Sequence, residues 1–355
     1  MSVSAKAPGV LKLLGEHAVV YDYLAVAVAV DRFATTEITS TYGSDLIISL
    51  DDLNKSFTFT REDLLRIYNK YREIGFKSTE AVLRFREESG IPQDVLPFVL
   101  IAARLAYQYD VNVAGMHAHI RSDIPIGKGL ASSAACSTSF AISLERAGKA
   151  MLPESDILDV AIDGERVTHG NPGAGRIDVS TSYYGGVVSV QKGRTPFARK
   201  EEISNLPDII VIDTGPKKST AETVGIISKR RAVDPDYANQ RLAEIGRASV
   251  EGLAALQEGK FDTLGSCMNT CQHMLAELGV SSDGLDIAIH RAREAGASGA
   301  KLSGGGGGGA AIAIGPDPKM LMEKLGQSKF NVSTYEISNI GAMHFRYEKN
   351  KAKSV

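Results

Sequence analysis

Several features are scarce in this sequence, and each absence excludes a class of protein. Three cysteines are too few, and odd in number, for a disulfide framework. No run of about 18 apolar residues is present to span a membrane, and the N-terminus lacks the apolar core of a signal peptide. A formal net charge of −2 provides no basic surface for nucleic acid. We therefore expect a soluble cytoplasmic protein that binds neither nucleic acid nor membranes.

The composition is that of a globular protein with a sizeable core, since 43% of the residues are hydrophobic and 23% are charged. A length of 355 residues favours two domains. The segment 195–207 is the expected connection between them. The predicted N-terminal domain covers residues 1–195, and the predicted C-terminal domain covers residues 196–355.

Hydrophobic periodicity predicts strands and helices in both halves of the chain. Strands are expected at residues 24–30, 35–41, 46–50, 116–120, 183–191, 209–213, 310–314, 332–337 and 343–347. Helices are expected at residues 98–109, 133–149, 154–168, 234–258, 260–278, 283–295 and 317–327. The charged segment 56–90 is expected to form an excursion or lid rather than core, and residues 169–181 a loop. This mixture predicts an α+β protein with two layers in each half.

The most informative segment, residues 125–135, is a glycine-containing loop that turns into a helix. Gly127 and Gly129 allow the main chain to approach phosphate oxygens, and the helix start offers N–H groups and a positive dipole end. Ser132 and Ser133 are expected to cap this helix, and one hydroxyl could bind a phosphate-bound Mg²⁺. The spacing is not that of a Walker A loop, and an ordinary helix-opening turn remains the alternative.

A second glycine cluster, residues 304–309, follows Lys301 and precedes the apolar strand expected at 310–314. Flexible linkers rarely run straight into such a strand. We therefore favour close approach of this backbone to a ligand or to another loop over a linker.

Charged residues in two further segments are candidates for catalytic or binding roles. Glu165 lies near a predicted helix end, where a carboxylate gains nothing from the dipole unless a cation is nearby. Asp178 follows a loop broken by glycine and proline, and it could accept a proton from a substrate hydroxyl or simply form an Asx turn. Lys12 is embedded in an apolar strand and should pair with an anion if buried. Glu16 and His17 suit hydroxyl or carboxylate binding, or a purely structural role.

Taken in order, these segments resemble the three motifs of the GHMP kinases, and more narrowly those of the mevalonate kinases. The resemblance rests on Gly15–Tyr21, Gly129–Ala135, Gly164–Arg166 with His169–Pro172, and Lys301–Gly309, and it covers nearly the whole chain. It implies a ribosomal S5-like N-terminal domain, a ferredoxin-like C-terminal domain, and ATP with Mg²⁺ in the cleft between them. A homodimer also fits the resemblance.

The resemblance further implies roles for individual residues. Mg²⁺ would be held by Ser133 and Glu165, while Asp178 would bind or deprotonate the substrate hydroxyl. Lys12 is the second predicted catalytic residue, as a replacement for the family lysine. The ATP phosphates would be wrapped by Pro125, Gly127, Lys128, Gly129, Leu130, Ala131, Ser132, Ser133 and Ala134. The substrate would contact Glu16, His17, Gly305 and Gly306. Arg176 is also predicted to contact the substrate, although the family pattern has no counterpart for it. In such phosphoryl transfer, the protein positions the reactants and neutralises charge on the phosphates, and it takes little part in covalent chemistry.

Three departures from the family pattern bear on the substrate. Val10 stands where the family has a lysine, and Lys12, two residues on along the same strand face, could supply that charge. Residues 171–178 are two residues longer than the usual acceptor loop, which introduces Arg176. Ala131 replaces a glycine that is usual in mevalonate kinases.

A guanidinium beside the reacting hydroxyl suits an acceptor that already carries a phosphate, or it could simply pair with Asp178. Archaeal mevalonate pathways include a kinase that phosphorylates the 5-hydroxyl of mevalonate 3-phosphate, and our hypothesis is this reaction. The alternatives are a mevalonate 5-kinase acting on free mevalonate, a kinase of another small alcohol or of phosphomevalonate, an ATP-dependent decarboxylase, and a catalytically silent ligand sensor.

Overall fold

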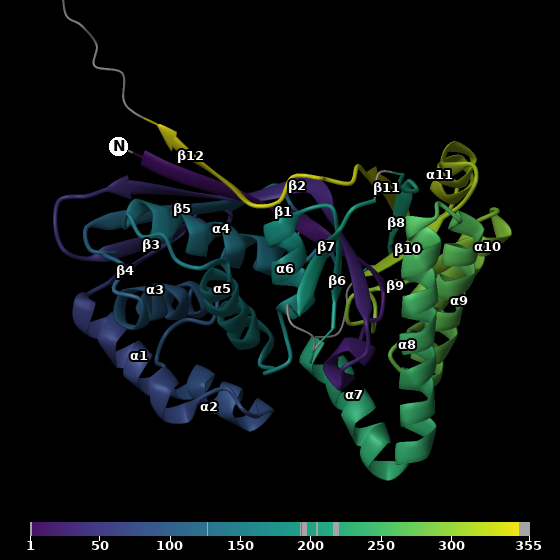
Figure 1. Cartoon of the computed structure of the whole chain (residues 1–355), viewed down its shortest axis with the longest axis horizontal. Helices are drawn as coiled ribbons and strands as arrows, with labels where there is room; N and C mark the ends of the chain where they lie inside the picture. Colours follow the sequence, from purple (N-terminus) through teal and green to yellow (C-terminus); the bar gives the residue numbers. More distant parts are fainter. Residues whose placement is uncertain are drawn as a thin grey trace, which may run out of the picture.

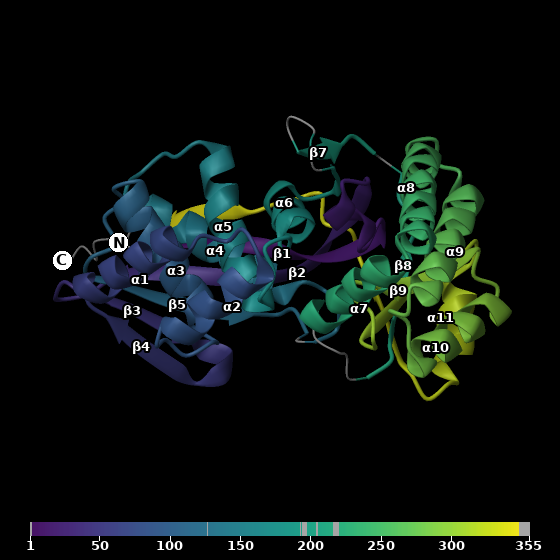
Figure 2. The same cartoon turned by 90° about the horizontal axis from the view of Figure 1, so that it is seen from below.

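The computed structural model describes residues 2–125, 127–191, 193, 197–203, 205–215 and 220–347. These residues form two β-sheets, each covered by helices, so that the chain has the predicted mixture of strands and helices (Figures 1 and 2). Ile126 of the glycine-containing loop and the predicted domain boundary at 195/196 lie outside the described residues.

The larger sheet has eight strands and runs in the order β12-β1-β2-β5-β3-β4, with β6 paired to β2 and β7 paired to β6. Among these strands, β3 and β5 are parallel and the other pairs are antiparallel. The strands are β1 (Ser2–Leu14), β2 (Ala25–Ser40), β3 (Leu46–Leu50), β4 (Lys55–Phe59), β5 (Met116–Ser122), β6 (Val187–Val190), β7 (Ala198–Glu201) and β12 (Met343–Tyr347). Two of them, β7 and β12, follow residue 196, so the two predicted domain ranges do not coincide with the two sheets.

The composition of β2 explains its central position. Its first six residues, Ala25–Val30, are all small or branched apolar residues and are all buried. Its second half alternates buried and partly exposed side chains, as in a strand with one solvent-facing side. The strand therefore passes from a part of the sheet covered on both faces to a part covered on one.

Helices cover one face of the larger sheet. Helix α4 (Ser132–Ala147) packs on β1 and β2, and α3 (Leu96–Gln108) and α5 (Glu154–His169) pack against α4. Two outer helices, α1 (Arg61–Ile74) and α2 (Thr79–Glu88), extend this layer (Figure 1). A capping box between Thr60 and Asp63 begins α1.

The smaller sheet has four strands in the order β11-β8-β10-β9, all antiparallel. The strands are β8 (Ile209–Asp213), β9 (Gly299–Ser303), β10 (Ala310–Ile314) and β11 (Asn331–Tyr335). Its helices are α7 (Thr220–Val233), α8 (Pro235–Gln257), α9 (Phe261–Glu277), α10 (Asp283–Glu294) and α11 (Pro318–Gly326). Helices α9 and α10 pack on β9, and α8 lies on α9 and also reaches β1 and β2.

Several predictions about local structure were wrong. Residues 56–90 are not simply a lid, because Leu64, Ile67 and Phe85 are buried in the core of the larger sheet. Residues 169–181 are not a loop throughout: α6 (Arg176–Tyr184) begins within them and shortens the strand expected at 183–191. Helix α7 and strands β4, β7 and β9 were not anticipated. No helix in the described part of the chain is both long enough and apolar enough to cross a membrane.

Candidate active site

A cavity of about 840 Å³ brings the predicted segments together. It is lined by the glycine-containing loop before α4, the end of β1, the loop between α5 and α6, and the glycine cluster after β9. Of the predicted site residues, those that line it are Lys12, Glu16, His17, Pro125, Gly127, Gly129, Leu130, Ala131, Ser132, Ser133, Glu165, Arg176, Asp178 and Gly305. Lys128, Ala134 and Gly306 do not.

The loop before α4 reaches its helix through left-handed backbone. Gly127 and Gly129 have φ values of 78° and 72°, which glycine adopts without steric cost. Ala131 follows with a φ of 50°, in the left-handed region that residues with a Cβ rarely adopt. No side chain caps α4, so the expected capping by Ser132 and Ser133 was wrong. The Ser132 hydroxyl instead lies 3.1 Å from that of Ser122. An uncapped helix start at the cavity wall is a suitable site for phosphate oxygens.

The hydroxyl of Ser133 and the carboxylate of Glu165 meet at the cavity wall. Ser133 Oγ donates a hydrogen bond of 3.0 Å to Glu165 Oε2, and His169 Nε2 lies 3.3 Å from the same oxygen. Glu165 is only 1% exposed, and its Oε1 has no hydrogen-bond partner among the described residues. A buried carboxylate oxygen without a partner, next to a hydroxyl, fits Mg²⁺, which takes few protein ligands and completes its shell with phosphates and water.

Lys12 and Asp178 form an ion pair, with Nζ 2.9 Å from Oδ1. Lys12 extends from β1, and Asp178 lies in the first turn of α6. Burial lowers the pKa of Lys12, but Asp178 and the nearby carboxylates outweigh it, so the net pKa is raised and the ammonium stays charged. Val10 is 1% exposed and belongs to an apolar cluster with Ile177. The cationic group on this face of β1 is therefore that of Lys12.

Glu16 and His17 lie where β1 meets the smaller sheet. The Glu16 carboxylate pairs with the ammonium of Lys301 on β9, and both side chains are almost completely buried. Glu16 Oε2 has no hydrogen-bond partner among the described residues. His17 Nε2 donates to the Gly305 carbonyl at 2.9 Å, and burial lowers the pKa of His17 to about 4, which keeps the ring neutral. We assigned Lys301 no role from the sequence, although a lysine at a strand position next to apolar residues was the available signal.

The strand ends that flank the glycine cluster, Ser303 and Ala310, lie against Gly129 of the loop before α4. A Cβ on Gly129 would lie 3.1 Å from the Ala310 Cβ and 3.3 Å from the Ser303 carbonyl oxygen, so this contact favours glycine. Gly306 has a φ of 79°, and a Cβ there would overlap the Val280 carbonyl oxygen, which gives Gly306 a packing role away from the cavity.

Two predicted phosphate-loop residues point elsewhere. Lys128 forms an ion pair with Asp213 at the end of β8, and Ala134 is fully buried in the core of the larger sheet. The backbone of this loop, rather than these two side chains, faces the cavity.

Arg176 is the first residue of α6 and lines the cavity. Its guanidinium lies over the ring of Phe197, with Cζ 5.7 Å from the ring centroid. No described carboxylate forms an ion pair with it, so the alternative that Arg176 pairs with Asp178 was wrong. Burial and the neighbouring guanidinium of Arg166 lower the pKa of Arg176, as expected for cations crowded together.

Sequence analysis missed several cavity residues. Helix α7 contributes Val224 and Ser228, and the connection between α1 and α2 contributes Phe76 and Lys77. Arg166 also lines the cavity. Arg166 lies within a segment that carries the family resemblance, but no role was assigned to it from the sequence. The other four residues lie in no recognisable motif and reach the cavity through packing between distant elements.

Comparisons with known proteins identify the family of the chain. Family models described as "GHMP kinases N terminal domain" and "GHMP kinases C terminal" match residues 80–186 and 253–322. The chain is 31% identical to a mevalonate kinase of Thermococcus sibiricus, covering 89% of this chain and 90% of that one. It is 28% identical to a mevalonate kinase of Aeropyrum pernix, covering 95% and 97%.

Solved structures support the fold. The crystal structure of Methanococcus jannaschii mevalonate kinase superposes with a TM-score of 0.73 at 24% identity, covering 94% of this chain and 98% of that one. The crystal structure of L. major mevalonate kinase in complex with R-mevalonate gives a TM-score of 0.69 at 20% identity, covering 94% of both chains. The predicted two-domain fold is thereby confirmed, and the chain belongs to the GHMP kinase family, with mevalonate kinases among its relatives.

Proposed function

We propose that this protein transfers the terminal phosphoryl group of ATP to the 5-hydroxyl of mevalonate 3-phosphate. GHMP kinases use ATP as phosphate donor, and the relatives are kinases. The observation that supports phosphoryl transfer most directly is the convergence of the Ser133–Glu165 pair and the Lys12–Asp178 pair on one cavity.

In this proposal, each group of site residues has a separate role in phosphoryl transfer. The backbone of residues 127–133 would hold the phosphates at the start of α4. Asp178 would accept the proton of the attacking hydroxyl, and the Lys12 ammonium, which pairs with Asp178, would stabilise the developing negative charge. Mg²⁺ held by Ser133 and Glu165 would neutralise charge on the phosphate oxygens. Glu16 Oε2 is a buried acceptor at the cavity wall for a further hydroxyl of the acceptor.

The charge of the cavity supports a phosphorylated acceptor. Arg176 forms no ion pair with a described carboxylate. Burial and the guanidinium of Arg166 lower the pKa of Arg176, and the carboxylates of Asp159 and Asp22 offset this only in part. An anionic ligand would relieve this repulsion between guanidinium groups, and arginine binds phosphate through paired hydrogen bonds. A second candidate, phosphorylation of free mevalonate, is favoured by the names of the archaeal relatives.

An ADP-release assay at saturating ATP, run with mevalonate, mevalonate 3-phosphate and mevalonate 5-phosphate, tests the proposal. We expect the highest kcat/KM for mevalonate 3-phosphate, and the phosphorus NMR spectrum of the product should show a new 5-phosphate. Turnover of free mevalonate at an equal or higher kcat/KM would replace our proposal with the second candidate. Binding of ATP without turnover of any acceptor would favour a ligand sensor.

A further inference from the structure

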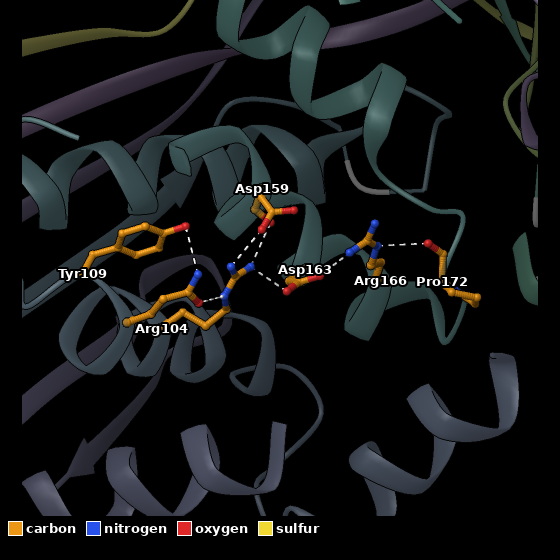
Figure 3. A network of polar contacts seen from close by, with 7 residues as sticks. Arg104, Tyr109, Asp159, Asp163, Arg166 and Pro172 are labelled. Carbon is orange, nitrogen blue, oxygen red and sulfur yellow. Dashed lines mark hydrogen bonds and ion pairs between the residues drawn. The ribbon is translucent and has the colours of Figure 1, made fainter. Parts of the chain in front are cut away.

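A chain of charged side chains runs behind the candidate active site (Figure 3). Arg104 on α3 is 1% exposed and donates through Nη1 to Asp163 Oδ2 at 2.6 Å and through Nη2 to Asp159 Oδ2 at 2.8 Å. The second oxygen of the fully buried Asp163 accepts a hydrogen bond of 2.6 Å from Arg166 Nη1. One buried carboxylate therefore holds two arginines, one from the core and one that lines the cavity.

Arg166 extends this chain to the acceptor loop between α5 and α6. Its Nε donates to the Pro172 carbonyl at 2.9 Å, and its own carbonyl accepts from the backbone N–H of Asn171 at 3.0 Å. The Asn171 side chain in turn accepts from the backbone N–H of Gly173 at 2.7 Å. The first half of the loop is thus tied to α5 at both the backbone and the side chain of Arg166.

The loop that Arg166 holds leads directly into the turn that carries Asp178. Gly175 is the N-cap of α6, and Asp178 lies in the first turn. A Cβ on Gly175 would overlap the Glu165 side chain, so the loop crosses closely over α5. Movement at Pro172 would therefore be transmitted within a few residues to the carboxylate that faces Lys12.

We propose that Arg166 is a positioning residue that sets the acceptor loop, and with it Asp178, for phosphoryl transfer. The inference rests on the function proposed above. A guanidinium is suited to this task because its rigid planar fork donates in two directions at once, here to Asp163 and to Pro172. On the buried side, the ion pair between Arg104 and Asp163 fixes the orientation of Asp163 and thereby that of the Arg166 guanidinium. Arg104 also compensates the negative charge of the buried Asp163 carboxylate.

The test compares Arg166→Lys and Arg166→Met with the wild-type protein. Lysine can keep the ion pair with Asp163 but cannot also hold the Pro172 carbonyl in the same geometry, so it separates loop positioning from loss of folding. Arg84→Met is the matched control, because Arg84 forms exposed ion pairs with Glu73 and Glu88 on the outer helices, away from the cavity. Two experiments are made on each protein. Steady-state kinetics gives kcat and KM, and hydrogen exchange gives the exchange rates of the backbone amides in residues 171–178.

For both Arg166 variants we expect kcat to fall about tenfold or more while KM for ATP changes less than about twofold, since Asp178 acts in the chemical step. We also expect exchange within 171–178 to accelerate about tenfold, with exchange in α3 and α4 of the Lys variant unchanged. Arg84→Met should alter neither quantity.

Faster loop exchange with unchanged kcat would overturn the proposal, as would a lower kcat with wild-type loop exchange, which would indicate a direct substrate contact. If the wild-type protein phosphorylates none of the acceptors, the proposed function fails, but loop exchange still decides whether Arg166 sets this loop. Wild-type exchange in both variants would then reject the positioning role independently.

Discussion

Replacing Lys301 with methionine tests the buried pair that joins the two sheets at the cavity. Lys301 and Glu16 are 0% and 1% exposed at their side chains, so neither charge is solvated by bulk water. Removing the ammonium leaves a buried carboxylate with one oxygen already unpartnered among the described residues. Loss of one member of a buried ion pair costs about 3–5 kcal/mol. We therefore expect Lys301→Met to lower the free energy of unfolding by about that amount at pH 7.

The double variant Glu16→Leu/Lys301→Met distinguishes the cost of leaving the Glu16 carboxylate unpaired from the cost of losing the ion pair itself. Both charges are then replaced by apolar side chains, and such replacements are often close to neutral. We expect the double variant to recover to within about 1–2 kcal/mol of the wild type. Lys70→Met serves as a control, because the Lys70–Glu88 pair is partly exposed and its loss should cost about 0–1 kcal/mol.

Equilibrium unfolding in urea gives these free energies. Far-UV circular dichroism is the suitable probe, since the chain contains no tryptophan for fluorescence. A cost below about 1 kcal/mol for Lys301→Met would refute the argument that this carboxylate depends on its buried partner. The Glu16→Leu single variant is measured as well. If the loss of unfolding free energy in the double variant equals the sum of the losses in Glu16→Leu and Lys301→Met, the two residues are not coupled and the argument is refuted.

Three further predictions concern the site. Asp178→Asn should lower kcat about 100-fold or more with KM for ATP within about twofold, and a smaller loss in steady-state assays would argue against Asp178 as the proton acceptor. Arg176→Ala should raise KM for mevalonate 3-phosphate about tenfold and leave KM for mevalonate unchanged; equal effects on both acceptors would defeat its phosphate contact. Burial lowers the pKa of His17 from 6.5 to about 4, so the unfolded chain binds the extra proton between these values and stability falls as pH decreases. Urea unfolding at pH 7 and pH 5 should show that His17→Gln removes about 2 kcal/mol of this loss, and equal losses in both proteins would contradict it.

The parts of the site that could be predicted from sequence are those encoded by local backbone chemistry. Glycines before a helix predicted the loop that turns into α4, and six consecutive glycines before an apolar strand predicted a close backbone approach. The helix start was predicted correctly, but not its cap: Ala131 adopts the left-handed conformation there, and the serine hydroxyls bond to Ser122 and Glu165 instead. Competition from tertiary hydrogen bonds is not visible in a local pattern.

Pairings between distant residues could not be predicted. Lys12 and Glu16 were singled out as charged residues in an apolar segment, but their partners Asp178 and Lys301 lie far along the chain. The start of α6 was missed for a different reason. Glycines and a proline at 170–175 predict a break, and they gave no indication that a helix begins directly afterwards at Arg176.

The pairing of β12 with β1 has a consequence for how the chain is completed. Ser2 stands opposite Tyr347, so β1 acquires its outer neighbour only after all the chain between these two residues has been synthesised. Until then β1 is an unprotected edge, with free backbone groups able to pair with another nascent chain. A version that ends at residue 340 would keep every cavity-lining residue yet retain that edge permanently, and aggregation rather than lost chemistry is its expected defect.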